Sequence, residues 1–291
     1  MVSHTRQFTR ARRAALHRAD RLAGVILPLL ATGAMGGVLA GMFGVGGGII
    51  MVPLLMLWAR MDQRQAAATS LVAIVPTAVA GATTYGIAGE IDLVAAALVG
   101  AGAFAGAPLG AYLLRALPLA WLRWAFIVGM LVAAARLILV EPERGSDIDL
   151  SPLVALGLLL LGIVMGVAAG MFGIGGGVIA VPVLIALFGM GDLAAKGTSL
   201  AAMIPAAISG TIPNLRAGLV DVRQGLLVGI AAVLASQGGV TLAFLVPPAL
   251  SGILFGSLLV LVAAQLVVRA VRAGRRERRE RDAPDDEAPI G

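Results

Sequence analysis

Long uncharged stretches dominate the pattern of hydrophobic and polar positions along this chain. One runs from Leu22 to Ala59 and another from Leu150 to Gly191. A membrane-spanning helix needs about 20 apolar residues, so each stretch is too long for one span and has to turn inside or at the membrane. The turns are predicted at the glycine blocks 44–48 and 173–177, because consecutive glycines form helix poorly and adopt positive φ easily.

Further apolar segments follow these breaks. Directly after the glycine blocks come 49–59 and 178–191, which as helices rise only about 16 to 21 Å and so predict short, half-membrane helices. Three longer apolar segments then follow in each half, at about 66–89, 93–114, 120–140, 195–215, 224–246 and 250–268. No acidic or basic residue is expected between the ends of the spans. The predicted fold class is an all-α polytopic membrane protein.

The two halves of the chain are copies of one another. GMFGVGGGIIMVP at 41–53 returns as GMFGIGGGVIAVP at 170–182, and TSLVAIVPTAVAG at 69–81 returns as TSLAAMIPAAISG at 198–210. Both matches have the same offset of 129 residues. A duplication with a glycine break at the corresponding place in each half is typical of transporters, and the break points to the binding site.

Composition agrees with a membrane protein and concentrates the charges at the edges. Hydrophobic residues make up 59% of the chain, charged residues 13%, and the mean hydropathy is +0.96, which is more apolar than a soluble core requires. The predicted organisation is a basic cytoplasmic tail at 1–21, a first transmembrane repeat at 22–140, an acidic extracytoplasmic linker at 141–151, a second transmembrane repeat at 152–268, and a basic, then acidic, disordered cytoplasmic tail at 269–291.

The arginines distinguish parallel from inverted repeats. If each broken stretch enters the membrane and returns to the same side, the arginines beside the spans fall on the side of both tails: Arg60, Arg64, Arg115, Arg123, Arg216 and Arg223. The acidic linker and a loop containing Asp192 and Lys196 then fall on the other side. Only this count obeys the positive-inside rule, and the basic tails act as topology signals rather than as nucleic-acid-binding segments. The prediction is two inverted repeats, the architecture of alternating access.

The glycine blocks are the first candidate binding site. A helix that begins near Gly48, and its copy near Gly177, presents unpaired N–H groups and a partial positive charge. Without side chains in the way, an anion can approach this backbone closely. The residues predicted to bind substrate there are Gly44, Gly46, Gly47, Gly48, Gly173, Gly175, Gly176 and Gly177. The alternative is that these glycines only allow helices to pack closely.

Polar residues in the following span add candidate donors. Two hydroxyls stand at its start in each copy: Thr69, Ser70, Thr198 and Ser199. They either donate hydrogen bonds to a bound oxyanion or cap and back-bond the helix. Asn214 stands where the first copy has Tyr85, so it is a candidate for substrate choice, with a plain end-of-helix role as the alternative.

Two aspartates match across the repeat and stand just before apolar segments. N-capping is the expected role of Asp92 and Asp221, with coupling to H⁺ or Na⁺ as the alternative. No metal or cofactor is expected, because the chain has no cysteine and both histidines, His4 and His17, lie in the N-terminal tail. Spans without mid-helix charges argue against a divalent-cation permease and against an intramembrane hydrolase, so the chain is not expected to be an enzyme.

The repeated motif also resembles a known family. The paired G-x-G-G-G-x-x-x-V-P motifs, Gly44 to Pro53 and Gly173 to Pro182, together with the following T-S-L segments, are similar to the TauE/SafE sulfite exporter family, also called TSUP. The resemblance covers residues 22–268. It implies a multi-pass permease of the bacterial inner membrane that moves small sulfur-containing or carboxylate anions such as sulfite, sulfonates or sulfoacetate, often outward.

The leading hypothesis is a secondary transporter, an exporter of small anions, that works by alternating access at the paired glycine breaks. Its expected partners are the anion and the lipid bilayer, with both termini cytoplasmic and no nucleic acid. A passive anion channel would use the same amides without alternating gates. A membrane scaffold or assembly factor would use the glycines only for packing. The sequence leaves the anion, the direction of transport, the coupling ion and the oligomeric state open.

Overall fold

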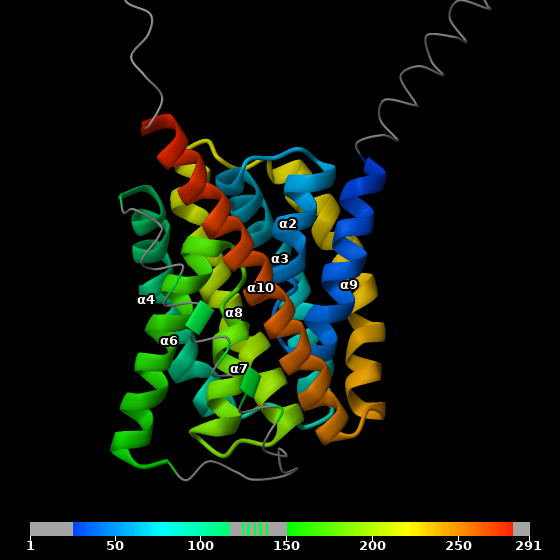
Figure 1. The fold of residues 1–291 in the computed structure, drawn as a ribbon. Helices are drawn as coiled ribbons and strands as arrows, with labels where there is room; N and C mark the ends of the chain where they lie inside the picture. Colours follow the sequence, from blue (N-terminus) through cyan, green and yellow to red (C-terminus); the bar gives the residue numbers. More distant parts are fainter. Residues whose placement is uncertain are drawn as a thin grey trace, which may run out of the picture.

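The computed structural model describes residues 26–116 and 150–281, together with seven separate positions between them. Apart from those positions, the predicted tail at 1–21, the span at 120–140 and residues 141–149 of the predicted linker lie outside the described residues, as does the end of the last tail. Every regular element in the described part of the chain is a helix (Figure 1). The all-helical prediction is confirmed for that part.

The described chain begins with the N-terminal helix Ile26–Phe43, which leads into the first glycine break. The helices that follow are α2 (Gly48–Trp58), α3 (Gln63–Ile87), α4 (Leu93–Ala116), α6 (Pro152–Phe172), α7 (Gly177–Ala186), α8 (Asp192–Arg216), α9 (Val222–Leu245) and α10 (Pro248–Arg281). The two short apolar helices predicted after the glycine blocks are therefore confirmed as α2 and α7.

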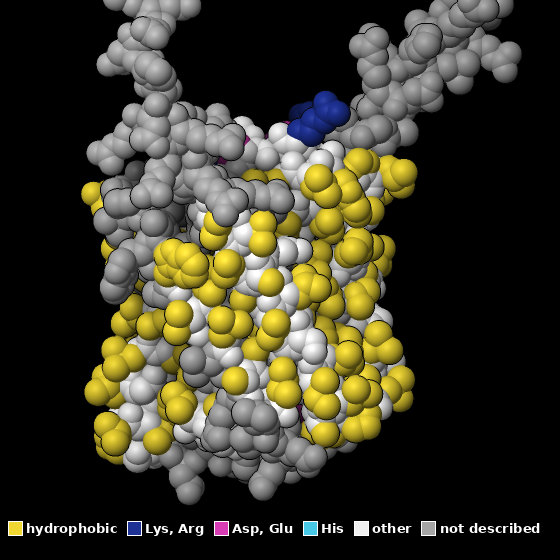
Figure 2. Space-filling model, in the orientation of Figure 1, with side chains coloured by type: hydrophobic (Ala, Val, Ile, Leu, Met, Phe, Trp, Pro, Cys, Tyr) yellow, Lys and Arg dark blue, Asp and Glu magenta, His cyan; other side chains and the backbone are white. Residues whose placement is uncertain are grey.

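Six of the described helices are long and apolar enough to cross a membrane: the N-terminal helix, α3, α4, α6, α9 and α10. Leucine, isoleucine, valine and phenylalanine side chains are exposed along their outer faces. In Figure 2 such hydrophobic side chains cover the flank of the molecule, whereas the basic side chains visible on this face lie at its upper edge. In water these surfaces would be unfavourable, and in lipid they are not. The protein is a multi-pass membrane protein.

Helices α3 and α8 form the centre of the bundle. They pack against each other, and α3 also packs on α9 while α8 packs on α4, α6 and α7. Most of the side chains along α8 are buried. Because α8 faces protein rather than lipid, it can carry Asp192, Lys196 and Asn214 without exposing them to the hydrocarbon.

The outer helices pack through glycines spaced four residues apart, as is common in membranes. The N-terminal helix meets α9 in this way, and α4 meets α6. A Cβ atom at each glycine would press against the backbone of its partner, in the pairs Gly33 with Val228, Gly37 with Ala232, Gly41 with Ser236, Gly162 with Val99, Gly166 with Ala103 and Gly170 with Ala107. Shifting the first three pairs by the repeat offset gives the last three, so the two halves use the same contact.

Helix directions and ends are visible in Figure 1. The N-terminal helix begins at the upper end of the bundle, whereas α6, its copy, begins at the lower end. Helix α10 also ends at the upper end, at the left in this view, whereas the N-terminal helix begins at the right. Helix α10 continues to Arg281 instead of ending near 268, because the arginines and glutamates that follow the apolar span are good helix formers.

Candidate functional site

Both glycine breaks adopt left-handed backbone conformations. Gly46 and Gly47 have φ of 73° and 72°, and Gly175 and Gly176 have φ of 79° and 80°. Residues with a Cβ rarely adopt this conformation, so the glycines are needed for it. Directly after them α2 begins at Gly48 and α7 at Gly177, where the sequence placed the helix starts.

The two breaks lie against each other. A Cβ atom at Gly48 would collide with the carbonyl oxygen of Gly173, and one at Gly177 would lie 2.5 Å from the carbonyl oxygen of Gly44. The starts of α2 and α7 therefore meet at one place, although they are far apart in the sequence. Two helix N-termini and their partial positive charges converge there.

A serine on each central helix donates a hydrogen bond to the glycine break of the opposite repeat. The Ser70 hydroxyl donates to the carbonyl of Gly173 at 2.6 Å and to that of Ala67 at 2.8 Å. The Ser199 hydroxyl donates to the carbonyl of Gly44 at 3.0 Å. Each serine thus binds the break of the other half of the chain. In this conformation the two predicted substrate donors bind carbonyl oxygens of the site itself.

Apolar side chains fill the space in front of the glycines. The Met203 sulfur lies 2.6 Å from the Cβ position of Gly46 and 3.1 Å from that of Gly175. Ile74 approaches the same two positions at 3.5 and 3.2 Å, and both side chains are fully buried. Ile74 and Met203 occupy the same place in the two repeats, five residues after Thr69 and Thr198. Sequence reasoning missed this pair, although its matched position inside the repeated segment that begins with T-S-L was a usable signal.

The remaining predicted polar residues do not gather at the breaks. The Thr198 hydroxyl accepts the N–H of Asp92 at 3.0 Å. The Asn214 side chain donates to the Gly210 carbonyl at 3.0 Å, and its buried oxygen has no hydrogen-bond partner among the described residues. Asn214 lies fifteen residues after Ser199 on α8, which corresponds to about 22 Å of helix. Thr69 is buried on α3.

Asp92 and Asp221 lie at the starts of α4 and α9. The Asp92 carboxylate accepts the N–H groups of Val94 and Ala95, both at 2.9 Å. The Asp221 carboxylate accepts the N–H groups of Arg223 and Gln224, at 3.0 and 3.2 Å. Both side chains therefore act as helix N-caps, the first of the two roles expected from the sequence.

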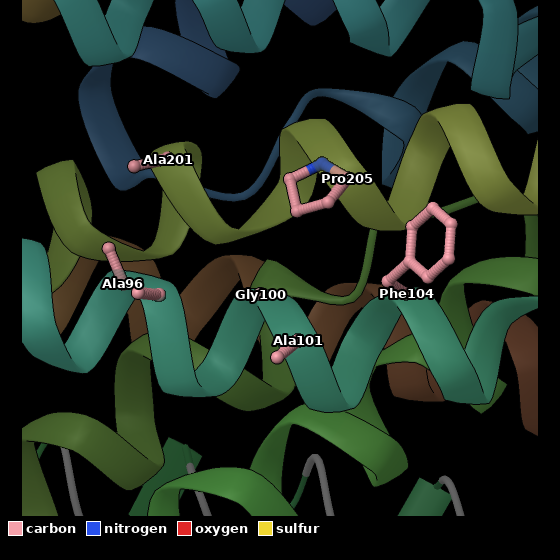
Figure 3. Close-up of a pocket in the computed structure, with 7 residues that line it drawn as sticks. Ala96, Gly100, Ala101, Phe104, Ala201 and Pro205 are labelled. Carbon is pink, nitrogen blue, oxygen red and sulfur yellow. The ribbon is translucent and has the colours of Figure 1, made fainter.

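A hollow of about 520 Å³ lies between α4 and α8. Its walls are Ala96, Ala97, Gly100, Ala101, Phe104, Ala201 and Pro205, most of which Figure 3 labels. Pro205 projects toward Gly100, and a Cβ there would lie 3.1 Å from the proline ring. The lining has no polar side chain, so nothing in it selects an anion.

A smaller cavity of about 50 Å³ lies beside both breaks. Ile49, just after the first break, and Ile174, inside the second, line it together with residues of α10. Two polar side chains, Gln63 and Gln265, also reach its wall. This cavity lies closer to the glycines than the hollow at Pro205 does.

The prediction that Asp192 and Lys196 lie in a loop is wrong. Both residues belong to the first turns of α8 and are buried, with Lys196 fully enclosed. The Lys196 ammonium group lies 2.7 Å from the Asp192 carboxylate and 2.7 Å from the Ser251 hydroxyl of α10. Pairing lowers the cost of burying the charges, so the helix starts earlier than its apolar sequence suggests. The expectation of spans without charge is corrected as well.

Comparison with known proteins gives consistent matches. Residues 3–137 and 158–289 each match the family model described as Sulfite exporter TauE/SafE. A probable membrane transporter protein of Xylella fastidiosa is 31% identical over 203 residues, which cover 67% of this chain and 76% of that protein. The probable membrane transporter protein YdhB of Bacillus subtilis is 30% identical over 191 residues, covering 64% of this chain and 77% of that protein.

Proposed function

This chain belongs to the sulfite exporter TauE/SafE family of membrane transporters, and from that premise we propose that it is a secondary transporter that exports small anions across the bacterial inner membrane. The substrates we propose are sulfite, organosulfonates and related carboxylates. We also propose that the two glycine breaks form the anion site.

The observation that carries this proposal is the meeting of the two breaks. The N-termini of α2 and α7 converge, and neither Gly48 nor Gly177 has a side chain that would keep an anion from the backbone amides. Discontinuous helices whose positive ends point at an anionic group are a recurring device of secondary transporters. The arrangement supports one anion held between two equivalent helix starts.

The site is closed in this conformation, because Ile74 and Met203 cover the glycines. Transport then requires the two central helices to move apart. Pro76 of α3 packs on Gly229 of α9 as Pro205 of α8 packs on Gly100 of α4. A proline removes one helical hydrogen bond and allows a bend. Matched bends in both halves support a rocking motion in which the site opens to alternate sides.

Helix directions support the inverted relation between the repeats. Arg60 and Arg64 adjoin the α2–α3 connection, and Arg216 and Arg223 adjoin the α8–α9 connection; both connections lie at the upper end in Figure 1. By the positive-inside rule we assign this end, and with it both termini, to the cytoplasm.

Counterflow in proteoliposomes tests the function. Vesicles loaded with sulfite should accelerate the entry of labelled sulfite, with an organosulfonate and a carboxylate as competitors. Only a carrier gives this trans-stimulation, whereas a passive channel carries the anion without it. A membrane scaffold would carry none of these anions.

Two variants at one position test the location of the site. Met203→Glu places a negative charge beside both breaks, and Met203→Gln has the same length without the charge. We expect the Glu variant to exchange at least about tenfold more slowly than the Gln variant, because a buried carboxylate repels an anion strongly. Both proteins are first checked for a single elution peak in detergent. Equal exchange rates would remove the glycine breaks as the anion site.

A further inference from the structure

Asp192 and Lys196 are the two charged side chains among the buried residues that the structure describes. They lie at the start of the central helix α8, and Ser251 of α10 completes the cluster. An ionisable residue inside a membrane protein is costly to bury and commonly marks the path of an ion or proton. The candidate aspartates of the sequence, Asp92 and Asp221, serve instead as helix caps.

The fold does not require this ion pair. The first repeat has Gln63 and Ala67 at the corresponding positions. Ala67 lies against the backbone of Gly173 in the same way as Lys196 lies against that of Gly44. An uncharged pair therefore supports the same packing in the other half. Because buried ion pairs stabilise little compared with apolar residues of similar size, the charges point to a role other than stability.

The cluster adjoins the anion site. The Lys196 backbone contacts Gly44, whose carbonyl accepts the hydrogen bond of Ser199 one helical turn further along α8. Phe43, the residue before Gly44, stacks on Phe255 of α10 with ring centroids 5.1 Å apart. Lys196 and the first glycine break are thus parts of one packed unit with α10.

We propose that Asp192, Lys196 and Ser251 form the charge-coupling site of the transporter, at which an anion pairs with Lys196 while Asp192 takes up a proton. This inference rests on the proposed function. The Asp192–Lys196 pair has no net charge when it is closed. It again has no net charge when a monovalent anion faces the lysine and the aspartate is protonated. A neutral cluster in both states avoids an uncompensated charge in a low-dielectric interior. The Ser251 hydroxyl can bond the lysine in both states.

Among the described residues, further titratable groups lie close to the start of α8. Tyr85 of α3 and the Glu90 carbonyl contact Gly197, and the Asp92 N–H binds Thr198. The Tyr85 hydroxyl donates to the Gly41 carbonyl at 2.8 Å. Within the described part of the chain, Glu90 and Asp92 are the residues with carboxylates whose backbones adjoin the cluster, and each is tested as a competing proton acceptor by its amide variant.

Calorimetry on the purified protein in detergent tests the proposal. The probe is ethanesulfonate, whose charge stays fixed between about pH 5 and pH 8, and buffers of different ionisation enthalpy give the number of protons bound. Wild type should take up about one proton per anion, so that Kd rises as much as about tenfold per pH unit as the pH is raised. Asp192→Asn should bind without proton uptake and with a Kd independent of pH.

The uncharged pair of the first repeat provides the matched variant. Asp192→Gln with Lys196→Ala reproduces Gln63 and Ala67, which occupy the equivalent place, so this variant is expected to fold. It should lose at least about tenfold in affinity and all proton uptake. Retained proton uptake in this variant, or its loss in Glu90→Gln or Asp92→Asn instead, would overturn the assignment. Anion binding by wild type without proton uptake would overturn the inference alone, whereas failure to bind ethanesulfonate, sulfite or acetate would overturn the proposed function with it.

Discussion

At the scale of single residues, the carbonyl groups of the glycine breaks determine which side chains matter. The carbonyls of Gly44 and Gly173 lie deep in the bundle and each receives a serine hydroxyl from the other half of the chain. In a membrane an unpaired carbonyl costs several kcal/mol, so these bonds are part of the fold as well as of the site. The sequence identified the serines but not their partners.

Removing one of these hydroxyls should destabilise the protein. Ser199→Ala leaves the Gly44 carbonyl without its donor, and we expect a loss of about 1 to 2 kcal/mol in the free energy of unfolding. The measurement is the free energy of unfolding of each variant in the same detergent. Ser236→Ala is the control, because the Ser236 hydroxyl donates to the Val233 carbonyl of its own helix. Equal stability of the two variants would contradict the role of Ser199 at the opposite break.

Two glycines with the same backbone conformation separate the effect of φ from that of packing. Gly47 and Gly89 have φ of 72° and 77°, but a Cβ at Gly47 would collide with the Gly36 carbonyl while nothing lies near one at Gly89. Gly89→Ala should cost about 1 to 2 kcal/mol from the strained φ. Gly47→Ala should cost about 1 to 3 kcal/mol more. Thermal unfolding of both variants provides the comparison. Similar losses of stability in the two variants would contradict the close contact between Gly47 and the Gly36 carbonyl.

At the scale of helices, glycines allow helices of the two halves to pack with their backbones in contact. The N-terminal helix and α9 interlock through the same spacing as α6 and α4. Without a hydrophobic force between helices in lipid, such backbone contact is what drives their association. The repeated sequence indicated which helices are equivalent, but not that each pairs with a helix of the opposite repeat.

Two neighbouring glycines of α9 test this contact. A Cβ at Gly239 would collide with the Val38 carbonyl of the N-terminal helix, whereas one at Gly238 would meet open space. Gly238→Ala should leave stability unchanged or raise it by up to about 1 kcal/mol, since alanine favours helix. Gly239→Ala should lower it by about 1 to 3 kcal/mol. Thermal unfolding in detergent distinguishes them, and a reversed order would refute the packing of these two helices.

At the scale of the whole molecule, we propose that an inverted relation of the repeats governs how the site opens. Two halves of opposite orientation present the same structure to the two sides of the membrane, which suits alternating access. The Asp192–Lys196 pair breaks this equivalence, since the corresponding residues of the first half are uncharged. One half therefore carries the charge that we propose for coupling.

The inverted topology can be measured with single cysteines, because the chain has none of its own. Ala88 and Ala217 are equivalent, exposed residues that follow α3 and α8. Ala88→Cys should react with a membrane-impermeant maleimide added outside intact cells, and Ala217→Cys should react only after the cells are opened. Labelling of both from the same side would rule out inverted repeats.

The sequence by itself determined the features that depend on neighbouring residues. Hydropathy and glycine content predicted the spans, the breaks and the short helices that follow them, because helix formation and membrane insertion respond to local composition. The tertiary structure alone decided which groups meet: Ile74 and Met203 over the glycines, the serines on the opposite breaks, and Lys196 between Asp192 and Ser251. These contacts join residues far apart in the chain, and their energies arise only when packing excludes lipid and water. The sequence did not predict that α8 begins at Asp192 for the same reason, since the ion pair between Asp192 and Lys196 forms only when the helix is packed in the bundle.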